Sequence, residues 1–191
     1  MTVRFGLLGY GLFGSHHARA IDQNERTSLV AVAAQSPDSR QAAKAEFPSI
    51  EVAENYHDVI RCDDVDIVDI VLPNQLHHEA ALAAIRAGKH VLLEKPLCET
   101  SEDIRTLKTI AAAANRVCMP SHNYIYAEDV RRLKYHTQSG HLGKVVSFWA
   151  LFNRSHPSSM GTPGFYMMRE LLVHHTYTML HFCGRPSYLT A

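Results

Sequence analysis

The sequence lacks an apolar run long enough to cross a bilayer, and its 191 residues carry no excess charge of either sign. Nineteen lysine and arginine residues balance nineteen acidic residues, which gives no indication of a nucleic acid or an anionic membrane as a partner. The first expected strand begins at Val3 and leaves no room before it for a signal peptide. We therefore expect no nucleic-acid partner and no association with a membrane.

Cysteine is scarce and is not spaced for a metal or redox site. The four cysteines, with no CxxC pair among them, are Cys62, Cys98, Cys118 and Cys183. Scattered cysteines are typical of buried thiols in a reducing compartment, which predicts a cytoplasmic protein. Histidine is plentiful, but adjacent pairs such as His174-His175 point in different directions on a helix and do not chelate. No metal site is expected.

The stretch around which the chain is organised is a glycine-rich turn between an apolar run and an expected helix. The run is typical of a strand and ends in Gly9-x-Gly11-x-x-Gly14. Gly9 permits a tight turn, Gly11 lets the backbone approach a pyrophosphate, and Gly14 allows the following helix to pack closely. The N–H groups at the start of that helix then bind the diphosphate. The pattern predicts a dinucleotide site that also includes Leu12 and Phe13.

No acidic residue stands at the end of the second expected strand, residues 28–34. In many dinucleotide-binding folds an acid at this position binds the ribose 2′-hydroxyl, whereas this chain has Ala34 followed by Gln35. Without the acid a 2′-phosphate is not repelled, and Gln35, Ser36 and Arg40 can hydrogen-bond to one. This favours NADP over NAD as the cofactor. Ser36 is interpreted equally well as a residue that caps the following helix.

Strands and helices alternate through the first two thirds of the chain. Further strands are expected at residues 66–72, 90–93 and 117–119, and helices at residues 15–21, 38–47, 55–60, 75–87 and 101–114, the last capped by residues 101–103. Such alternation predicts an α/β fold over residues 1–121, a doubly wound parallel (Rossmann) sheet that binds NAD(P).

The pattern changes at residue 122. The elements expected beyond it are a helix at residues 128–138, a long strand at 144–152, a helix at 166–182 and the opening of a strand at 187–191. These elements cannot close a sheet domain, because unpaired edges and an uncovered face would remain. We therefore expect residues 122–191 to be the first part of a larger domain and the chain to be truncated.

Four motifs together resemble the Gfo/Idh/MocA oxidoreductases, the family of glucose–fructose oxidoreductase and inositol dehydrogenase. They are the glycine turn at residues 9–14, Pro73-Asn74-Gln75-Leu76-His77, the block from Ala87 to Pro96, and the stretch from Ser139 to Val145. The resemblance implies reversible hydride transfer between a nicotinamide and a sugar, polyol or related substrate. It also implies a chain nearly twice as long, whose C-terminal α+β domain has an open antiparallel sheet that shapes the substrate pocket and commonly mediates homo-oligomerisation.

The same resemblance assigns roles to Glu94-Lys95-Pro96, which follows the fourth expected strand. Lys95 is implied as the cation that stabilises a developing alkoxide, at a strand end where open α/β sheets bind ligands. Glu94 is implied to meet the nicotinamide ribose or to orient Lys95, and Pro96 to turn the chain. The other residues implied near the cofactor are Pro73, Asn74, His77 and Asn123.

The catalytic base of the family is a histidine that lies ahead of a closing glycine. Counting back from Gly184 assigns this role to His174, with Glu170 as its partner. Residues four apart on one helix share a face, so the carboxylate can hold the tautomer of the imidazole and raise its basicity.

Three departures from the family pattern leave a second function open. Leu172 replaces the expected glycine, Tyr177 the expected aspartate, and Ile125 stands where many members have an arginine. The alternative to an enzyme is a non-catalytic, regulatory NAD(P)-binding protein on the same fold, because a fold alone does not fix a function. The presence of Lys95 and His174 favours the enzyme.

Overall fold

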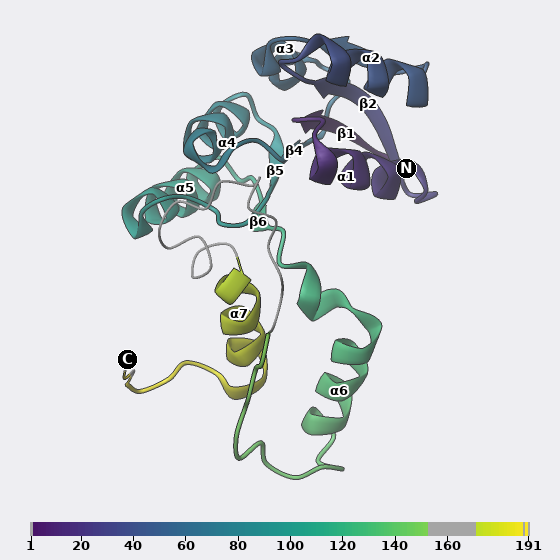
Figure 1. The fold of residues 1–191 in the computed structure, drawn as a ribbon. Coiled ribbons are helices and arrows are strands. Elements are labelled where there is room, and N and C mark those ends of the chain that lie inside the picture. The colour runs from purple at the N-terminus through teal and green to yellow at the C-terminus, as the bar shows by residue number, and fades with distance from the viewer. Residues whose placement is uncertain (1, 153–170, 189, 191) are drawn as a thin grey trace. The chain divides into compact units, whose positions relative to one another are not determined.

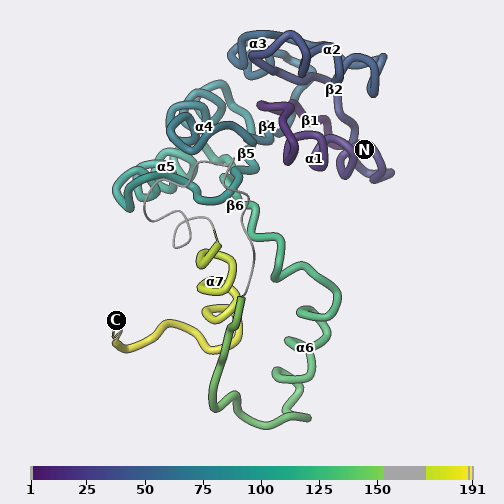
Figure 2. Tube along the Cα trace, viewed as in Figure 1, coloured from purple at the N-terminus to yellow at the C-terminus, as the bar shows by residue number. Residues whose placement is uncertain are grey.

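The computed structural model describes residues 2–152, 171–188 and 190 of the chain. The chain divides into two compact units, residues 1–121 and residues 122–191 (Figure 1). Figure 2 follows the same path along the Cα trace.

A parallel sheet lies at the centre of the first unit, as predicted, and it has six strands, one more than expected. Its strands are β1 (Val3–Leu8), β2 (Thr27–Ala33), β3 (Glu51–Ala53), β4 (Ile67–Ile70), β5 (His90–Leu93) and β6 (Cys118–Pro120). Their order is β3-β2-β1-β4-β5-β6, so the direction of strand addition reverses between β1 and β4. Ligands of such sheets bind at the carboxyl ends of the strands beside this reversal. The sequence did not predict β3, whose three residues pair with the end of β2.

Helices cover both faces of the sheet. They are α1 (Leu12–Asp22), α2 (Pro37–Glu46), α3 (Tyr56–Arg61), α4 (His77–Arg86) and α5 (Ser101–Ala113), with the 3-10 turn η1 (Asn74–Leu76) before α4. Ser36 caps α2, because its Oγ accepts a hydrogen bond from the N–H of Ser39 at 3.1 Å. Thr100 rather than residues 101–103 caps α5, since its Oγ1 accepts the N–H of Asp103 at 3.1 Å.

The core lies in two layers, one on each side of the sheet. Adjacent residues of a strand point to opposite faces, so Leu7 and Leu8 of β1 are both fully buried but join different layers. Leu7 packs in the layer that contains Ala18 of α1. Leu8 packs in the layer that contains Ala80 and Ala84 of α4. The small side chains on the helices allow these helices to lie close to the sheet.

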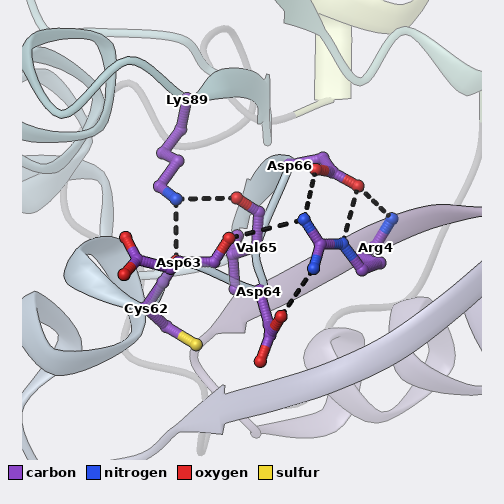
Figure 3. Close-up of polar contacts among 7 residues, drawn as sticks. All are labelled: Arg4, Cys62, Asp63, Asp64, Val65, Asp66 and Lys89. Carbon is purple, nitrogen blue, oxygen red and sulfur yellow. Dashed lines mark hydrogen bonds and ion pairs between the residues drawn. The ribbon is translucent and has the colours of Figure 1, made fainter.

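Charged residues join the amino ends of β1, β4 and β5 at the opposite edge from the glycine turn. We call this group the amino-edge cluster; its members are Arg4, Asp64, Asp66 and Lys89 (Figure 3). Arg4 donates to the carboxylate of Asp66 through Nε at 3.2 Å and Nη2 at 3.0 Å. This bonding lowers the pKa of Asp66 below its ordinary value. Lys89 Nζ donates at 2.7 Å to two backbone carbonyls of the turn before β4.

The second unit contains three described helical segments. They are the 3-10 turn η2 (Asn123–Tyr126), α6 (Glu128–Gln138) and α7 (Leu172–Cys183). The bounds of α6 are those expected, and Gly184 ends α7 with a φ of +76°. The first part of the helix expected at 166–182 lies outside the described residues.

Both strands expected in the second unit are wrong where the structure describes them. Residues 144–152 form no strand, and Val146, Trp149 and Leu151 are about nine-tenths exposed. Ser187, Tyr188 and Thr190 are not in a strand either. A strand exists only when a neighbour accepts and donates its backbone hydrogen bonds, and among the described residues of this unit there is no such neighbour.

The cysteines do not all have the expected burial. All four are free thiols, but only Cys98 is buried; Cys62 and Cys118 are half-buried and Cys183 is exposed. Burial raises the pKa of Cys98 and of Cys118 to about 11, so these two are unreactive near neutral pH. Cys183 lies at the end of α7, where the described part of the second unit has little core to cover it. No helix in the described ranges is long and apolar enough to span a membrane.

Candidate cofactor site

A cleft of about 620 Å³ opens at the carboxyl ends of β1, β2 and β4, within the volume range of small-molecule sites. Predicted residues that line it are Gly9, Gly11, Gln35, Ser36 and Pro73. Residues that the sequence did not single out also line it, among them Tyr10, Ser39, Glu54, Asn55 and Tyr56. Asn55 and Tyr56 follow β3, which explains why they were missed.

The three glycines of the turn meet different surroundings. Gly9 has a φ of +98°, and a Cβ there would overlap the carbonyl oxygen of Val71. A Cβ on Gly14 would overlap the carbonyl oxygen of Gly9, so the start of α1 packs directly on the turn. A Cβ on Gly11 meets no atom of the described residues within 4 Å. Gly9 and Gly14 are therefore required by the fold, whereas Gly11 leaves space open to a ligand.

The amino end of α1 is suited to an anion. Gly11 is its N-cap and makes no side-chain hydrogen bond to the helix, and the first turn consists of uncharged residues. Backbone N–H groups at a helix start carry partial positive charge and bind phosphate. Leu12 and Phe13 in this turn are exposed.

The loop after β2 contains the residues predicted to meet a 2′-phosphate. Arg40 donates through Nη1 to the carbonyl oxygens of Ala34 at 3.0 Å and Gln35 at 2.6 Å. Its Nη2 also lies 3.2 Å from the carboxylate of Glu54. Arg40 thus shapes the loop, and its positive charge is partly balanced. Ser36, which caps α2, still lines the cleft, so the cap and the ligand contact are compatible.

Lys95 and the glycine turn come together from distant parts of the sequence. Lys95 Nζ lies 5.9 Å from the ring centroid of Phe13, a cation–π contact. The Lys95–Pro96 peptide bond is cis. His77, the buried first residue of α4, has Nδ1 at 2.9 Å from the carbonyl oxygen of Pro96 and Nε2 at 2.8 Å from that of Leu72. It links the loops after β4 and β5.

A buried polar group, of which the sequence indicated only Glu94, lies beside this loop. We call it the carboxyl-edge cluster; its members are His17 of α1, Asp69 of β4 and Glu94 after β5. Burial lowers the pKa of His17, but hydrogen bonds to Asp69 and Glu94 outweigh it and raise this pKa to about 10. Burial raises the pKa of Asp69. The only sequence signal for this cluster is an acid inside the otherwise apolar strand β4.

The second unit contains the histidine predicted as catalytic base. His174 is 9% exposed and stacks on Tyr124, with the ring centroids 4.4 Å apart. Its Nδ1 lies 3.1 Å from the hydroxyl of Tyr177, which accepts the backbone N–H of Tyr124. Tyr177 thus contacts the imidazole from the position of the expected aspartate. Glu170 lies outside the described residues, and Asn123 begins η2.

No group of three or more candidate metal ligands occurs within the ranges that the structure describes. The reversal of strand order, the glycine turn and the cleft at the strand ends together define a dinucleotide-binding domain of the Rossmann class. The model of the oxidoreductase family with an NAD-binding Rossmann fold (GFO_IDH_MocA) matches residues 3–122, and the chain belongs to this family.

Relatives of the chain include dehydrogenases of cyclic polyols and sugars. The chain is 28% identical to scyllo-inositol 2-dehydrogenase (NADP(+)) IolW of Bacillus subtilis, over 100% of this chain and 54% of that protein. It is 30% identical to levoglucosan dehydrogenase of Pseudarthrobacter phenanthrenivorans, over 77% of this chain and 40% of that protein. The chain therefore spans about half the length, or less, of these curated relatives.

Solved structures of similar fold agree with this comparison. The oxidoreductase yvaA of Bacillus subtilis has a TM-score of 0.86 and 29% identity, over 97% of this chain and 53% of that one. Scyllo-inositol dehydrogenase of Lactobacillus casei, solved with NAD(H) and scyllo-inositol, has a TM-score of 0.71 and 29% identity, over 75% of this chain and 43% of that one.

Proposed function

We propose that the protein is an NAD(P)-dependent dehydrogenase that oxidises a CH–OH group of a sugar or polyol. The observation that carries this proposal is Lys95 beside the glycine turn, in a chain of a family whose members include inositol and levoglucosan dehydrogenases. A cation at the carboxyl end of β5 can stabilise an alkoxide that develops next to the cofactor. The polyol class comes from the names of the relatives.

The residues present suit a dinucleotide. Gly11 leaves space for a diphosphate at the start of α1, and the cleft beside it has room for the adenosine end. A bound nicotinamide supplies the hydride acceptor. In this proposal Lys95 holds the substrate oxygen, and Pro73, Asn74 and Glu94 lie toward the cofactor.

His174 is the proposed acceptor of the hydroxyl proton. Its Nδ1 contact with the hydroxyl of Tyr177 would set which ring nitrogen carries the proton. We also propose that Glu170 is the carboxylate partner of His174. Asn123, next in sequence to the Tyr124 that stacks on His174, is proposed to lie near the cofactor. The second unit as a substrate and oligomerisation domain is likewise a proposal, as is the cytoplasmic location, which the four free cysteines support.

We further propose NADP as the preferred cofactor. Support comes from Ala34 and Gln35 in place of an acid after β2, and from the name of the relative IolW. The ion pair between Arg40 and Glu54 works against a strong preference, because the carboxylate offsets the charge available to a 2′-phosphate.

The test is to titrate the protein with NADPH and NADH by fluorescence and then to assay a full-length form of it on a panel of polyols and keto-sugars. The expected result is saturable binding, tighter for NADPH, with turnover of a cyclic polyol. The second candidate, a regulatory NAD(P)-binding protein, is favoured by Tyr177 in place of the expected aspartate. Tight NADPH binding without turnover of any substrate would support that candidate. Absence of binding would exclude both.

A further inference from the structure

The chemistry proposed above leaves one buried carboxylate without a role. Asp69 lies in β4 with 1% of its surface exposed, between apolar neighbours. Burying a carboxylate is costly unless it is paired and hydrogen-bonded. Its Oδ2 lies 2.8 Å from Nδ1 of His17, whereas its Oδ1 has no partner among the described residues. A buried charge that is only half satisfied is poor evidence for a stabilising role and calls for another explanation.

The contacts of His17 lead from the sheet interior to the loop that contains Lys95. Its second ring nitrogen, Nε2, lies 3.4 Å from Oε1 of Glu94. The other oxygen of Glu94, Oε2, accepts the backbone N–H of Lys95 at 2.9 Å. A continuous series of polar contacts therefore runs from β4 through α1 to the backbone of the proposed catalytic lysine, entirely within the first unit.

The protonation state of His17 follows from this geometry. A neutral imidazole carries a single N–H and can donate to one carboxylate only, whereas the imidazolium donates to both. The titratable groups around it are Asp69 of β4, Glu94 and Lys95 after β5, and His16 on its own helix. Two carboxylates at the ring nitrogens favour the charged form.

We infer that His17 is a positioning residue, whose imidazolium is anchored by Asp69 and fixes the carboxylate of Glu94 against the backbone of Lys95. Asp69 holds the imidazole in place, and Glu94 transmits that placement to the cofactor end of β5. This inference rests on the proposed function, since the consequence of a misplaced Glu94 is weaker dinucleotide binding.

A double-mutant cycle tests the coupling between His17 and Glu94. NADPH affinity is measured for the parent, His17→Gln, Glu94→Gln and the double variant. We expect His17→Gln to weaken binding about tenfold, within the coupling range of residues in direct contact, but to have less than about a twofold effect when Glu94 is already Gln. His16→Gln is the matched control: it makes the same change one residue earlier at an exposed position, and its affinity should equal that of the parent. Additive effects would overturn the inference.

A further variant separates positioning from mere structural support. His17→Gln leaves the Asp69 charge buried and can unfold the domain, so His17→Gln is combined with Asp69→Asn, which removes that charge. The combined variant should recover the thermal unfolding temperature and keep the weakened NADPH affinity, because Glu94 still lacks its contact with His17. If affinity recovers together with stability, His17 only supports Asp69 and the inference fails.

An NMR titration of the histidine side chains gives a readout independent of the proposed function. His17 should titrate well above the exposed histidines, and Glu94→Gln should lower its midpoint. If His17 titrates together with His16, or if Glu94→Gln leaves its midpoint unchanged, the network does not exist as described. Failure of the proposed function appears instead as absent NADPH and NADH binding by the parent.

Discussion

The charged clusters at the amino ends and at the carboxyl ends of the strands, here the amino edge and the carboxyl edge of the sheet, differ in how far they are exposed to water. At the amino edge, Arg4 pairs with Asp66 (Figure 3). Both side chains are 39% exposed, so their charges are largely solvated. At the carboxyl edge, the side chains of His17 and Asp69 are 18% and 1% exposed. Exposed pairs contribute about 0 to 1 kcal/mol, whereas removing one partner of a buried pair costs about 3 to 5 kcal/mol. We therefore expect the fold to tolerate substitutions in the amino-edge cluster. In the carboxyl-edge cluster, loss of any one partner should lower its stability.

The two clusters also differ in their distance from the proposed cofactor site. The amino-edge cluster ties together the starts of β1, β4 and β5, where no ligand of an open α/β sheet binds. The carboxyl-edge cluster lies beside the glycine turn and the Lys95 loop. The buried charges, whose desolvation costs free energy, therefore lie at the strand ends where open α/β sheets bind ligands.

Gly11→Val should abolish binding of NADPH and NADH. A Cβ at this position meets no described protein atom within 4 Å, so the change fills ligand space rather than disturbing the fold. Calorimetry should give an unfolding temperature close to that of the parent, and a fluorescence titration should show no saturation. Gly14→Ala is the contrasting variant, expected to destabilise the domain because its Cβ overlaps the carbonyl of Gly9. Normal affinity in Gly11→Val would contradict the placement of the diphosphate.

His17→Ala should lower the free energy of unfolding by about 3 kcal/mol, because it leaves the carboxylate of Asp69 buried without its cation. Urea unfolding followed by circular dichroism measures this loss. Arg4→Ala at the other edge is the matched comparison, since it also removes a cation from two carboxylates, and it should cost clearly less. Equal losses at both edges would refute the contrast drawn from burial.

Gln35→Glu should weaken NADPH binding about tenfold relative to NADH, since a carboxylate at the end of β2 repels a 2′-phosphate and accepts a ribose hydroxyl. Parallel titrations with the two nucleotides give the ratio. Glu51→Gln on β3, an exposed change of one charge outside the cleft lining, serves as control. A ratio unchanged by Gln35→Glu would place the adenosine ribose elsewhere.

The stability of the protein should decline as the pH rises from about 7 to 9. The pKa of His17 is raised to about 10 in the fold against an ordinary value near 6.5, so its imidazolium stabilises the fold fully below about 6.5. That stabilisation is lost as the pH rises toward 10. Thermal unfolding in a pH series should show the decline in the parent and its absence in His17→Gln combined with Asp69→Asn. The buried thiols of Cys98 and Cys118 add their own effect only above pH 9.

Asp66→Asn should have the smallest effect, a loss below about 1 kcal/mol that shrinks further in high salt. The pKa of Asp66 is lowered by Arg4, so its contribution is present above about pH 4 and is lost in acid. Urea unfolding at low and high ionic strength measures it. A loss as large as that of His17→Ala would show that burial does not decide the difference between the edges.

The sequence by itself determined what depends on neighbouring residues. The strand–glycine–helix order at residues 3–22 predicted both β1–α1 and the candidate diphosphate site, because turn geometry, helix start and close packing are local requirements. The bounds of β5 and α6 were predicted for the same reason, since apolar periodicity and a terminating glycine act within a few residues.

Only the tertiary structure decided the features that need partners from afar. β3 forms because the free side of β2 supplies hydrogen-bond partners to three residues that have no strand pattern of their own. Residues 144–152 are rich in strand formers but form no strand, because no described strand pairs with them. His17, Asp69 and Glu94 are separated by 52 and 25 positions. They meet because α1 packs on β1 and β2 and the side chain of His17 reaches Asp69 of β4 and Glu94 after β5. Hydrogen-bond partners and burial at long range are properties of the folded chain, so the sequence could name Glu94 but not the histidine that holds it.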